Sequence, residues 1–212
     1  MLQITEIFKS IQGESSYSGL PCIFVRLTGC NLRCDYCDTE YAFYGGKKMT
    51  VGETISEIDR FGLKLVEVTG GEPLLQVESY DLMKRLLSLN YQVMLETSGS
   101  ISIQDVPEEV IKILDLKCPD SGEVEKNDFT NIDRLVSHDE VKFVIGSRKD
   151  YEWSRAVLLD YKLREKVNVL FSPVFDVLDL HLLAEWILED NIHVRLQTQL
   201  HKHIWNKNAT GV

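Results

Sequence analysis

Short apolar runs rich in β-branched residues recur along the chain, with longer amphipathic segments between them. Such runs are typical of buried strands, whereas apolar residues repeating every three to four positions indicate helices. The pattern predicts strands at 22–28, 64–68, 91–96, 113–117, 140–145, 167–171 and 192–196. It predicts helices near 51–61, 76–89, 128–136, 149–162 and 179–190, the last capped by Asp179 and carrying on one face Leu180, Leu183, Ala184 and Ile187.

This alternation predicts an α/β fold. Apolar strands joined by helices pair in parallel through right-handed crossovers, as in an open or closed barrel or a doubly wound sheet. Periodicity alone does not choose among these. A chain of 212 residues with no internal repeat and no Pro/Gly/Ser-rich linker is expected to form a single domain, which we assign to residues 1–205. The small polar tail at 206–212 is expected to be flexible.

The charge balance limits the classes of binding partner that we expect for the chain. Lys and Arg number 23 against 33 Asp and Glu, a formal net charge of -10, so a basic surface for nucleic acid is not expected. The sequence has no apolar stretch long enough to span a membrane and no signal-peptide pattern at its start. We therefore expect a cytoplasmic protein without a membrane or nucleic-acid partner.

Three of the five cysteines, Cys30, Cys34 and Cys37, fall within eight residues directly after the first predicted strand. Structural zinc sites usually have four ligands arranged in two pairs, and no second pair of Cys or His residues lies near these cysteines in the sequence. A cubane iron-sulfur cluster held by only three thiolates keeps one iron open for a substrate, which indicates catalysis. A partial zinc site remains an alternative. Cys22 is expected in the core.

The CxxxCxxC spacing, with Tyr36 before the third cysteine, resembles the signature of the radical S-adenosylmethionine (SAM) superfamily. Residues 69–73 (TGGEP) resemble the GGEP segment that contacts the amino group of SAM in that superfamily. The resemblance implies a [4Fe-4S] cluster that cleaves SAM to a 5'-deoxyadenosyl radical. It also implies a TIM-type barrel of parallel strands, here partial and open, because the helical segments between 97 and 140 are short.

Four further segments resemble the 7-carboxy-7-deazaguanine synthase family: 7–14 (IFKSIQGE), 24–30 (FVRLTGC), 37–39 (CDT) and 199–202 (QLHK). This resemblance implies a carbon-nitrogen lyase of queuosine-type 7-deazapurine biosynthesis. Such an enzyme contracts the ring of 6-carboxy-5,6,7,8-tetrahydropterin to 7-carboxy-7-deazaguanine and releases ammonia.

The resemblance also implies roles for single residues. The substrate would contact Gln12, Gly13, Arg26 and Thr69, and the hydroxyl of Thr39 would bind Mg²⁺. SAM would contact Tyr36, Asp38, Gly71, Lys117, Pro119, Asp120 and Ser172. Cys118 would then be a thiol in the pocket wall. His201 and Lys202 either close the pocket or lie on a surface turn.

The family implies an external one-electron donor, flavodoxin or ferredoxin, and a homodimer. Two other functions remain open. One is an activase that places a glycyl radical on a partner enzyme, which the QGE and CDT motifs disfavour. The other is a non-catalytic module that binds zinc or an iron-sulfur cluster.

Overall fold

The computed structural model describes residues 1–207 and 209–212. Within them nine strands form one sheet in the order β3-β1-β2-β4-β5-β6-β7-β8-β9. Their bounds are β1 Leu2–Ile11, β2 Pro21–Leu27, β3 Lys47–Met49, β4 Leu65–Gly70, β5 Gln92–Thr97, β6 Ile111–Leu116, β7 Glu140–Ile145, β8 Asn168–Pro173 and β9 Arg195–Leu196. The strands β2 and β4 to β9 pair in parallel, and β3 and β9 form the open edges. The predicted α/β fold with an open partial barrel is confirmed.

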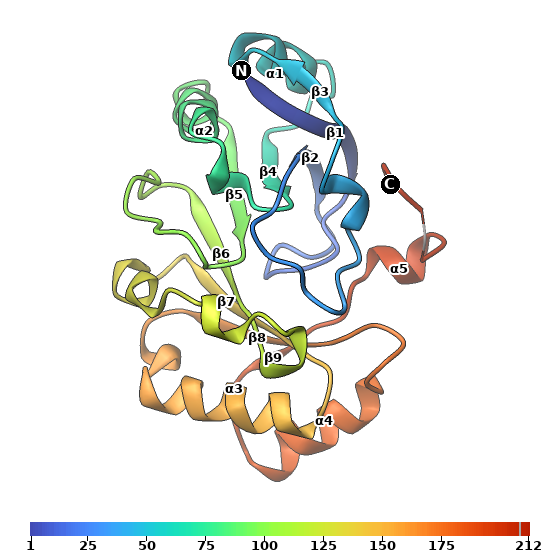
Figure 1. Cartoon of the computed structure of the whole chain (residues 1–212), viewed down its shortest axis with the longest axis vertical. Coiled ribbons are helices and arrows are strands. Elements are labelled where there is room, and N and C mark those ends of the chain that lie inside the picture. Colours follow the sequence, from blue (N-terminus) through green and yellow to red (C-terminus); the bar gives the residue numbers. More distant parts are fainter. Residues whose placement is uncertain (208) are drawn as a thin grey trace.

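The sheet curves around an interior, and the longer helices lie on its outer side (Figure 1). The helices are α1 Val51–Asp59, α2 Glu78–Ser88, α3 Arg148–Asp160, α4 Leu180–Glu189 and the short α5 His201–Ile204. As predicted, Asp179 caps α4, because its carboxylate accepts a hydrogen bond of 2.7 Å from the amide of His181. Leu183 and Ile187 are buried, whereas Leu180, at the first position of the helix, is exposed.

Two strands at one edge were not predicted. β1 pairs antiparallel with both β2 and β3, so this edge departs from the parallel pairing of the predicted strands. A register shift between Ile4 and Glu6 interrupts the alternation of apolar and polar residues in β1. The strand therefore cannot be recognised from a pattern that repeats every two residues. β3 is only three residues long and mostly exposed.

The segment between β6 and β7 also differs from the prediction. Instead of an α-helix at 128–136, the structure has three short 3-10 helices, Pro119–Ser121, Val124–Lys126 and Phe129–Arg134. The connection from β5 to β6 has no helix in the described residues. The expected shortening of the barrel is therefore located in these two crossovers.

Alternation along each parallel strand separates the main core from the interior of the barrel. Val66 and Val68 of β4 pack with the helices in the larger apolar cluster, whereas Glu67 and Thr69 face the interior. The other strands repeat this arrangement. A smaller apolar cluster fills the amino-terminal end of the interior and consists of Cys22, Phe24, Leu65, Met94, Ile111 and Ile113. The polar interior positions therefore lie at the carboxyl ends of the strands.

Candidate active site

A cavity of about 750 Å³ occupies the interior at the carboxyl ends of the strands. Strand ends, the loop after β2 and the C-terminal segment all contribute to its wall. The residues predicted for the site that line it are Gln12, Gly13, Arg26, Cys30, Cys34, Tyr36, Cys37, Asp38, Thr39, Thr69, Gly71, Lys117 and Ser172. Pro119 and Asp120 do not belong to this lining, and Asp120 instead contacts Ser147 and the amino terminus of α3.

The three clustered cysteines lie in the loop between β2 and the 3-10 helix Glu40–Ala42. All three are half-buried and unpaired, and the amide of Cys37 donates to the carbonyl of Cys34 at 3.1 Å. Burial raises the pKa of each thiol, while the charge of Lys117 opposes that effect at all three. A bound cluster requires thiolates, so Lys117 favours the form of the cysteines that binds metal.

The residues present fit a cubane cluster with one open iron. In the described residues no group of three or more His, Cys, Asp or Glu side chains converges on a single metal ion. A cubane does not require such convergence, because each thiolate binds a different iron. Cys22 and Cys118 are fully buried in the core and do not line the cavity. The expectation that Cys118 is a pocket-wall thiol is wrong, because its sulfur points to Ser154 of α3 at 3.4 Å.

The glycines after β4 allow the strand end to approach the cysteine loop closely. A Cβ atom on Gly71 would overlap the carbonyl of Gly29 and lie 2.7 Å from Cβ of Cys30. The amide of Glu72 donates to the same carbonyl of Gly29 at 2.8 Å. Gly70 has a φ of 153°, in the region that glycine tolerates best. Both glycines are therefore required where β4 meets the loop, beside the thiols.

Glu72, by contrast, points away from the cavity. Its fully buried carboxylate accepts hydrogen bonds from the amide of Leu74 and the hydroxyl of Thr97, at 3.0 and 2.9 Å. The amide and hydroxyl of Ser98 also donate to it, at 2.8 and 2.6 Å. This carboxylate fastens the end of β4 to the end of β5 and holds the glycines in place.

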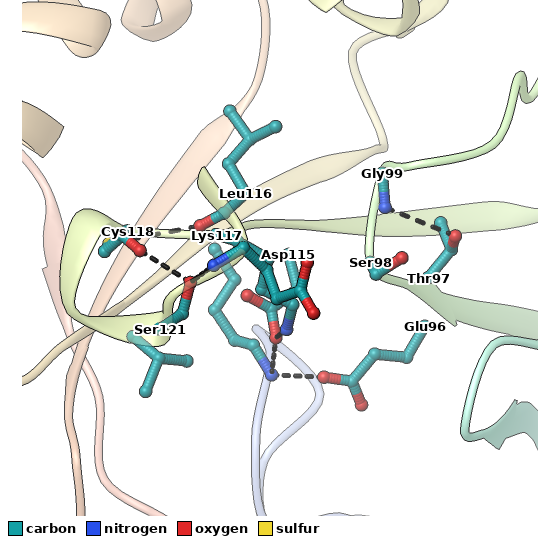
Figure 2. A network of polar contacts seen from close by, with 12 residues as sticks. Glu96, Thr97, Ser98, Gly99, Asp115, Leu116, Lys117, Cys118 and Ser121 are labelled. Atoms are coloured by element: carbon teal, nitrogen blue, oxygen red, sulfur yellow. Dashed lines mark hydrogen bonds and ion pairs between the residues drawn. The ribbon is translucent and has the colours of Figure 1, made fainter. Parts of the chain in front are cut away.

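A network of buried charges, not anticipated from the sequence, forms the cavity wall. Lys142 of β7 contacts Glu96 and lies 2.8 Å from Glu14 and 3.4 Å from Asp115. Asp115 also pairs with Lys117 at 2.9 Å. Figure 2 shows Glu96, Asp115 and Lys117 directed from adjacent strand ends toward the same space. A polar residue at an inward position of an otherwise apolar strand was the signal in the sequence.

One acceptor in this network has no partner. In the described residues, Oδ1 of Asp115 is buried without a hydrogen bond. A buried unsatisfied carboxylate oxygen in a cavity wall fits a ligand that carries N–H or O–H donors, such as the amino and hydroxyl groups of SAM. The glycines beside the thiols and this free acceptor together fit the cofactor expected here.

Both ends of the side-chain amide of Gln12 are hydrogen-bonded to other residues of the protein. Its amide nitrogen donates to Glu67, and its amide oxygen accepts from the amide of Glu14 at 2.9 Å. Burial raises the pKa of Glu67 well above its ordinary value, and the charges of Glu96 and Glu14 add to this effect. This shift favours the neutral form of the Glu67 carboxyl, against the opposing charge of Lys142.

Arg26 presents part of its guanidinium to the cavity. Its Nε atom donates to Glu6 at 2.8 Å, and the hydroxyl of Tyr41 donates to the same carboxylate oxygen. Among the described residues the two terminal nitrogens of Arg26 make no hydrogen bond, and its strand neighbour in β4 is Thr69. These two terminal nitrogens can donate hydrogen bonds to both oxygens of a carboxylate ligand.

The C-terminal segment closes one side of the cavity. His201 and Lys202 line it, which confirms the first of the two alternatives for these residues. Lys207 and residues 209–212 of the predicted tail lie along it too, and Lys207 contacts Asp176. Asn208, which belongs to the predicted tail, lies outside the described residues.

None of the helices found in residues 1–207 and 209–212 combines the length and the apolar character needed to cross a membrane.

Comparison with known proteins places the chain in a family. The model of the radical SAM superfamily matches residues 24–176. A 7-carboxy-7-deazaguanine synthase of Koribacter versatilis is 49% identical over the full length of both chains, and one of Chlorobaculum tepidum is 44% identical over the full chain and 97% of that relative. The crystal structure of QueE from Escherichia coli shares the fold, with a TM-score of 0.78, 23% identity and coverage of 94% of both chains. The chain therefore belongs to the radical SAM superfamily and, within it, to the 7-carboxy-7-deazaguanine synthase family.

Proposed function

We propose that this chain is a 7-carboxy-7-deazaguanine synthase, a lyase that converts 6-carboxy-5,6,7,8-tetrahydropterin to 7-carboxy-7-deazaguanine and ammonia for queuosine-type 7-deazapurine biosynthesis. One observation carries the proposal: a single cavity brings three half-buried thiols together with a free guanidinium edge and a wall of hydrogen-bonding groups. The full-length identity to relatives of that name supports it.

The cofactors are assigned to the half of the cavity near the cysteine loop. Cys30, Cys34 and Cys37 would hold the [4Fe-4S] cluster, and Gly71 would let SAM approach it. When bound, the cluster and SAM would supply the carbon radical needed to take a hydrogen atom from the substrate. Lys117 and Ser172 complete the wall on this side, and Tyr36 is fixed by a hydrogen bond of 3.2 Å to the carbonyl of Val144.

The substrate is assigned to the half that contains Arg26. The terminal nitrogens of Arg26 would bind the pterin carboxylate in a bidentate manner, with Thr69 beside them. The donors and acceptors of the pyrimidinone ring would face the polar wall formed by Glu14 and Glu67 and the backbone of Gly13. The side-chain amide of Gln12 and its main-chain amide and carbonyl already have protein partners, so we assign Gln12 the task of holding Glu67 and Glu14 beside the substrate.

Release of ammonia requires a proton at the departing nitrogen. The wall offers two kinds of groups that can carry a proton: the amine of Lys142 and the carboxyls of Glu67 and Glu96. Burial raises the pKa of both carboxyls, so they retain protons more readily than exposed glutamates do. We assign proton delivery to this group of residues.

Thr39 is the proposed protein ligand of Mg²⁺, which would otherwise bind substrate and water oxygens. The electron donor is proposed to be flavodoxin or ferredoxin, and the enzyme a cytoplasmic homodimer. Residues 1–205 are proposed to form its single domain.

The function is tested by anaerobic reconstitution. The chain with iron, sulfide, reductant, SAM, Mg²⁺ and carboxytetrahydropterin should form the deazapurine acid, detected by mass, without a protein substrate. A glycyl-radical activase would instead require a partner protein. A protein that binds zinc and shows no iron-sulfur absorption would contradict the proposal, as would an intact cluster that never cleaves SAM.

A further inference from the structure

The side chain of Asp38 joins the cysteine loop to the C-terminal segment. One oxygen accepts a hydrogen bond of 2.9 Å from the hydroxyl of the neighbouring Thr39. The other accepts from Nε2 of Gln199 at 3.0 Å and from Nζ of Lys202 at 2.7 Å. Both carboxylate oxygens are therefore hydrogen-bonded to protein groups. If Asp38 contacts SAM, we expect the contact to be made by its main chain.

Lys202 is the more enclosed partner of this pair. Its side chain is 10% exposed, against 47% for Asp38, and its ammonium lies 5.0 Å from the centre of the Phe175 ring. An enclosed ammonium needs a carboxylate, and Asp38 is the acidic residue that pairs with it in the described structure. The pair is thus a fixed ionic contact at the cavity wall.

The same segment is attached to the residues that follow β1. Gln199 donates to Glu14 at 2.9 Å as well as to Asp38, and the amide of Leu200 donates to the carbonyl of Gly13 at 2.9 Å. A Cβ atom on Gly13 would overlap the ring of His201, so the two segments touch without a gap. The C-terminal segment therefore bridges the predicted substrate side and the cysteine loop.

The hydrogen bond from Thr39 to Asp38 has a chemical consequence. A threonine hydroxyl carries one proton and two lone pairs. Because the proton is directed to Asp38, the lone pairs remain for a cation, and Thr39 lines the cavity. Lys202 and Gln199 hold the Asp38 carboxylate in the position where it accepts this proton.

We propose that Lys202 is a positioning residue: it fixes the Asp38 carboxylate, which orients the Thr39 hydroxyl toward Mg²⁺ and fastens the C-terminal segment across the cavity. This inference rests on the proposed function for its Mg²⁺ component. The bridge between the two segments does not depend on that function, because it is present in the chain alone.

Lys202→Met is the test variant, and Lys202→Arg keeps the charge. Lys207→Met is the matched control, because it removes a lysine a few residues along the same segment whose ion pair with Asp176 is exposed. If Lys202→Met does not fold, Asp38→Asn breaks the same contact from the other side.

The first measurement is hydrogen exchange on the cluster-free chain. Lys202→Met should accelerate exchange at 199–204 and also at 38–43, a segment it does not belong to, whereas Lys207→Met should leave 38–43 unchanged. The second measurement is the Mg²⁺ concentration for half-maximal turnover, which should rise about tenfold or more in Lys202→Met and be largely restored in Lys202→Arg.

Unchanged exchange at 38–43 in Lys202→Met, or the same Mg²⁺ requirement as Lys207→Met, would overturn the inference. If the unaltered chain shows no turnover, the proposed function fails, and the exchange measurement still decides whether the bridge exists.

Discussion

Lys142→Met removes the cation at the centre of the buried network and keeps a side chain of similar length. Three carboxylates, Glu14, Glu96 and Asp115, which are 17%, 24% and 11% exposed, then lose their common partner. Removing one partner of a buried ion pair typically costs about 3–5 kcal/mol, because the remaining charge has no compensation. For a chain of this size that corresponds to a fall in Tm of roughly 6–20 °C.

The loss should depend on pH in a defined direction. Burial raises the pKa of Glu96 above its ordinary value of 4.5 even with Lys142 present, and without Lys142 the pKa should rise further. The folded state of the variant then binds protons more tightly than the unfolded state, so its stability falls as pH rises from about 4.5 through the raised pKa. Glu14 changes in the same sense, because the charge and hydrogen bond of Lys142 are the largest effects that lower its pKa against the effect of burial, ahead of Gln199 and His201.

The assay is urea unfolding of the cluster-free chain at pH 5 and pH 8, comparing Lys142→Met with the unaltered protein. The double variant Glu96→Gln/Lys142→Met, which removes one of the uncompensated carboxylates, should recover part of the loss at pH 8. Lys112→Met is a useful comparison, because Lys112 is also buried but pairs with the single carboxylate of Asp139 at 3.2 Å, at the opposite ends of the strands. A loss below about 1 kcal/mol, or one that is larger at pH 5 than at pH 8, would refute this reasoning.

Three other variants test separate parts of the site. Cys34→Ala should abolish the iron-sulfur absorption and turnover, whereas Cys22→Ala, a change confined to the core, should keep both. Iron analysis and visible spectra of the two variants provide the comparison. A full cluster in Cys34→Ala would contradict the ligand assignment. Gly13→Ala places a methyl group against His201, so KM for the pterin should rise more than kcat falls, and unchanged kinetics would show that the C-terminal segment can move aside. Glu72→Gln sets an amide nitrogen against groups that already donate, which should cost about 1–3 kcal/mol in urea unfolding; equal stability would mean that these donors find other partners.

Much of the architecture was predictable because it depends on local pattern. The parallel strands fall within a few residues of their predicted positions, since a buried strand is apolar on both faces and is bounded by polar turns. β1 was not predictable in the same way, because its bulge shifts the phase of the apolar residues. The helix expected at 128–136 forms instead as a 3-10 helix, so its periodicity was too weak to distinguish the two.

The site, like the fold, contains residues that the sequence predicts and residues that it does not. The proposed cluster ligands Cys30, Cys34 and Cys37 were predicted from their spacing alone, which is a property of the sequence. Lys142 and Glu67, by contrast, look like single polar interruptions in apolar strands. Their role appears only when the curvature of the sheet brings residues far apart in sequence into one wall.

The sequence by itself determined the fold class, the proposed cluster ligands and the family, because these follow from local periodicity and from motifs of a few residues. The tertiary structure alone decided which way each polar side chain points. It turns Glu72 away from the cavity so that it joins the ends of β4 and β5, buries Cys118 against α3 and brings Lys202 to Asp38. The physical reason is that a buried charge or hydrogen-bonding group takes its function from its partners, and in this chain those partners come from distant segments.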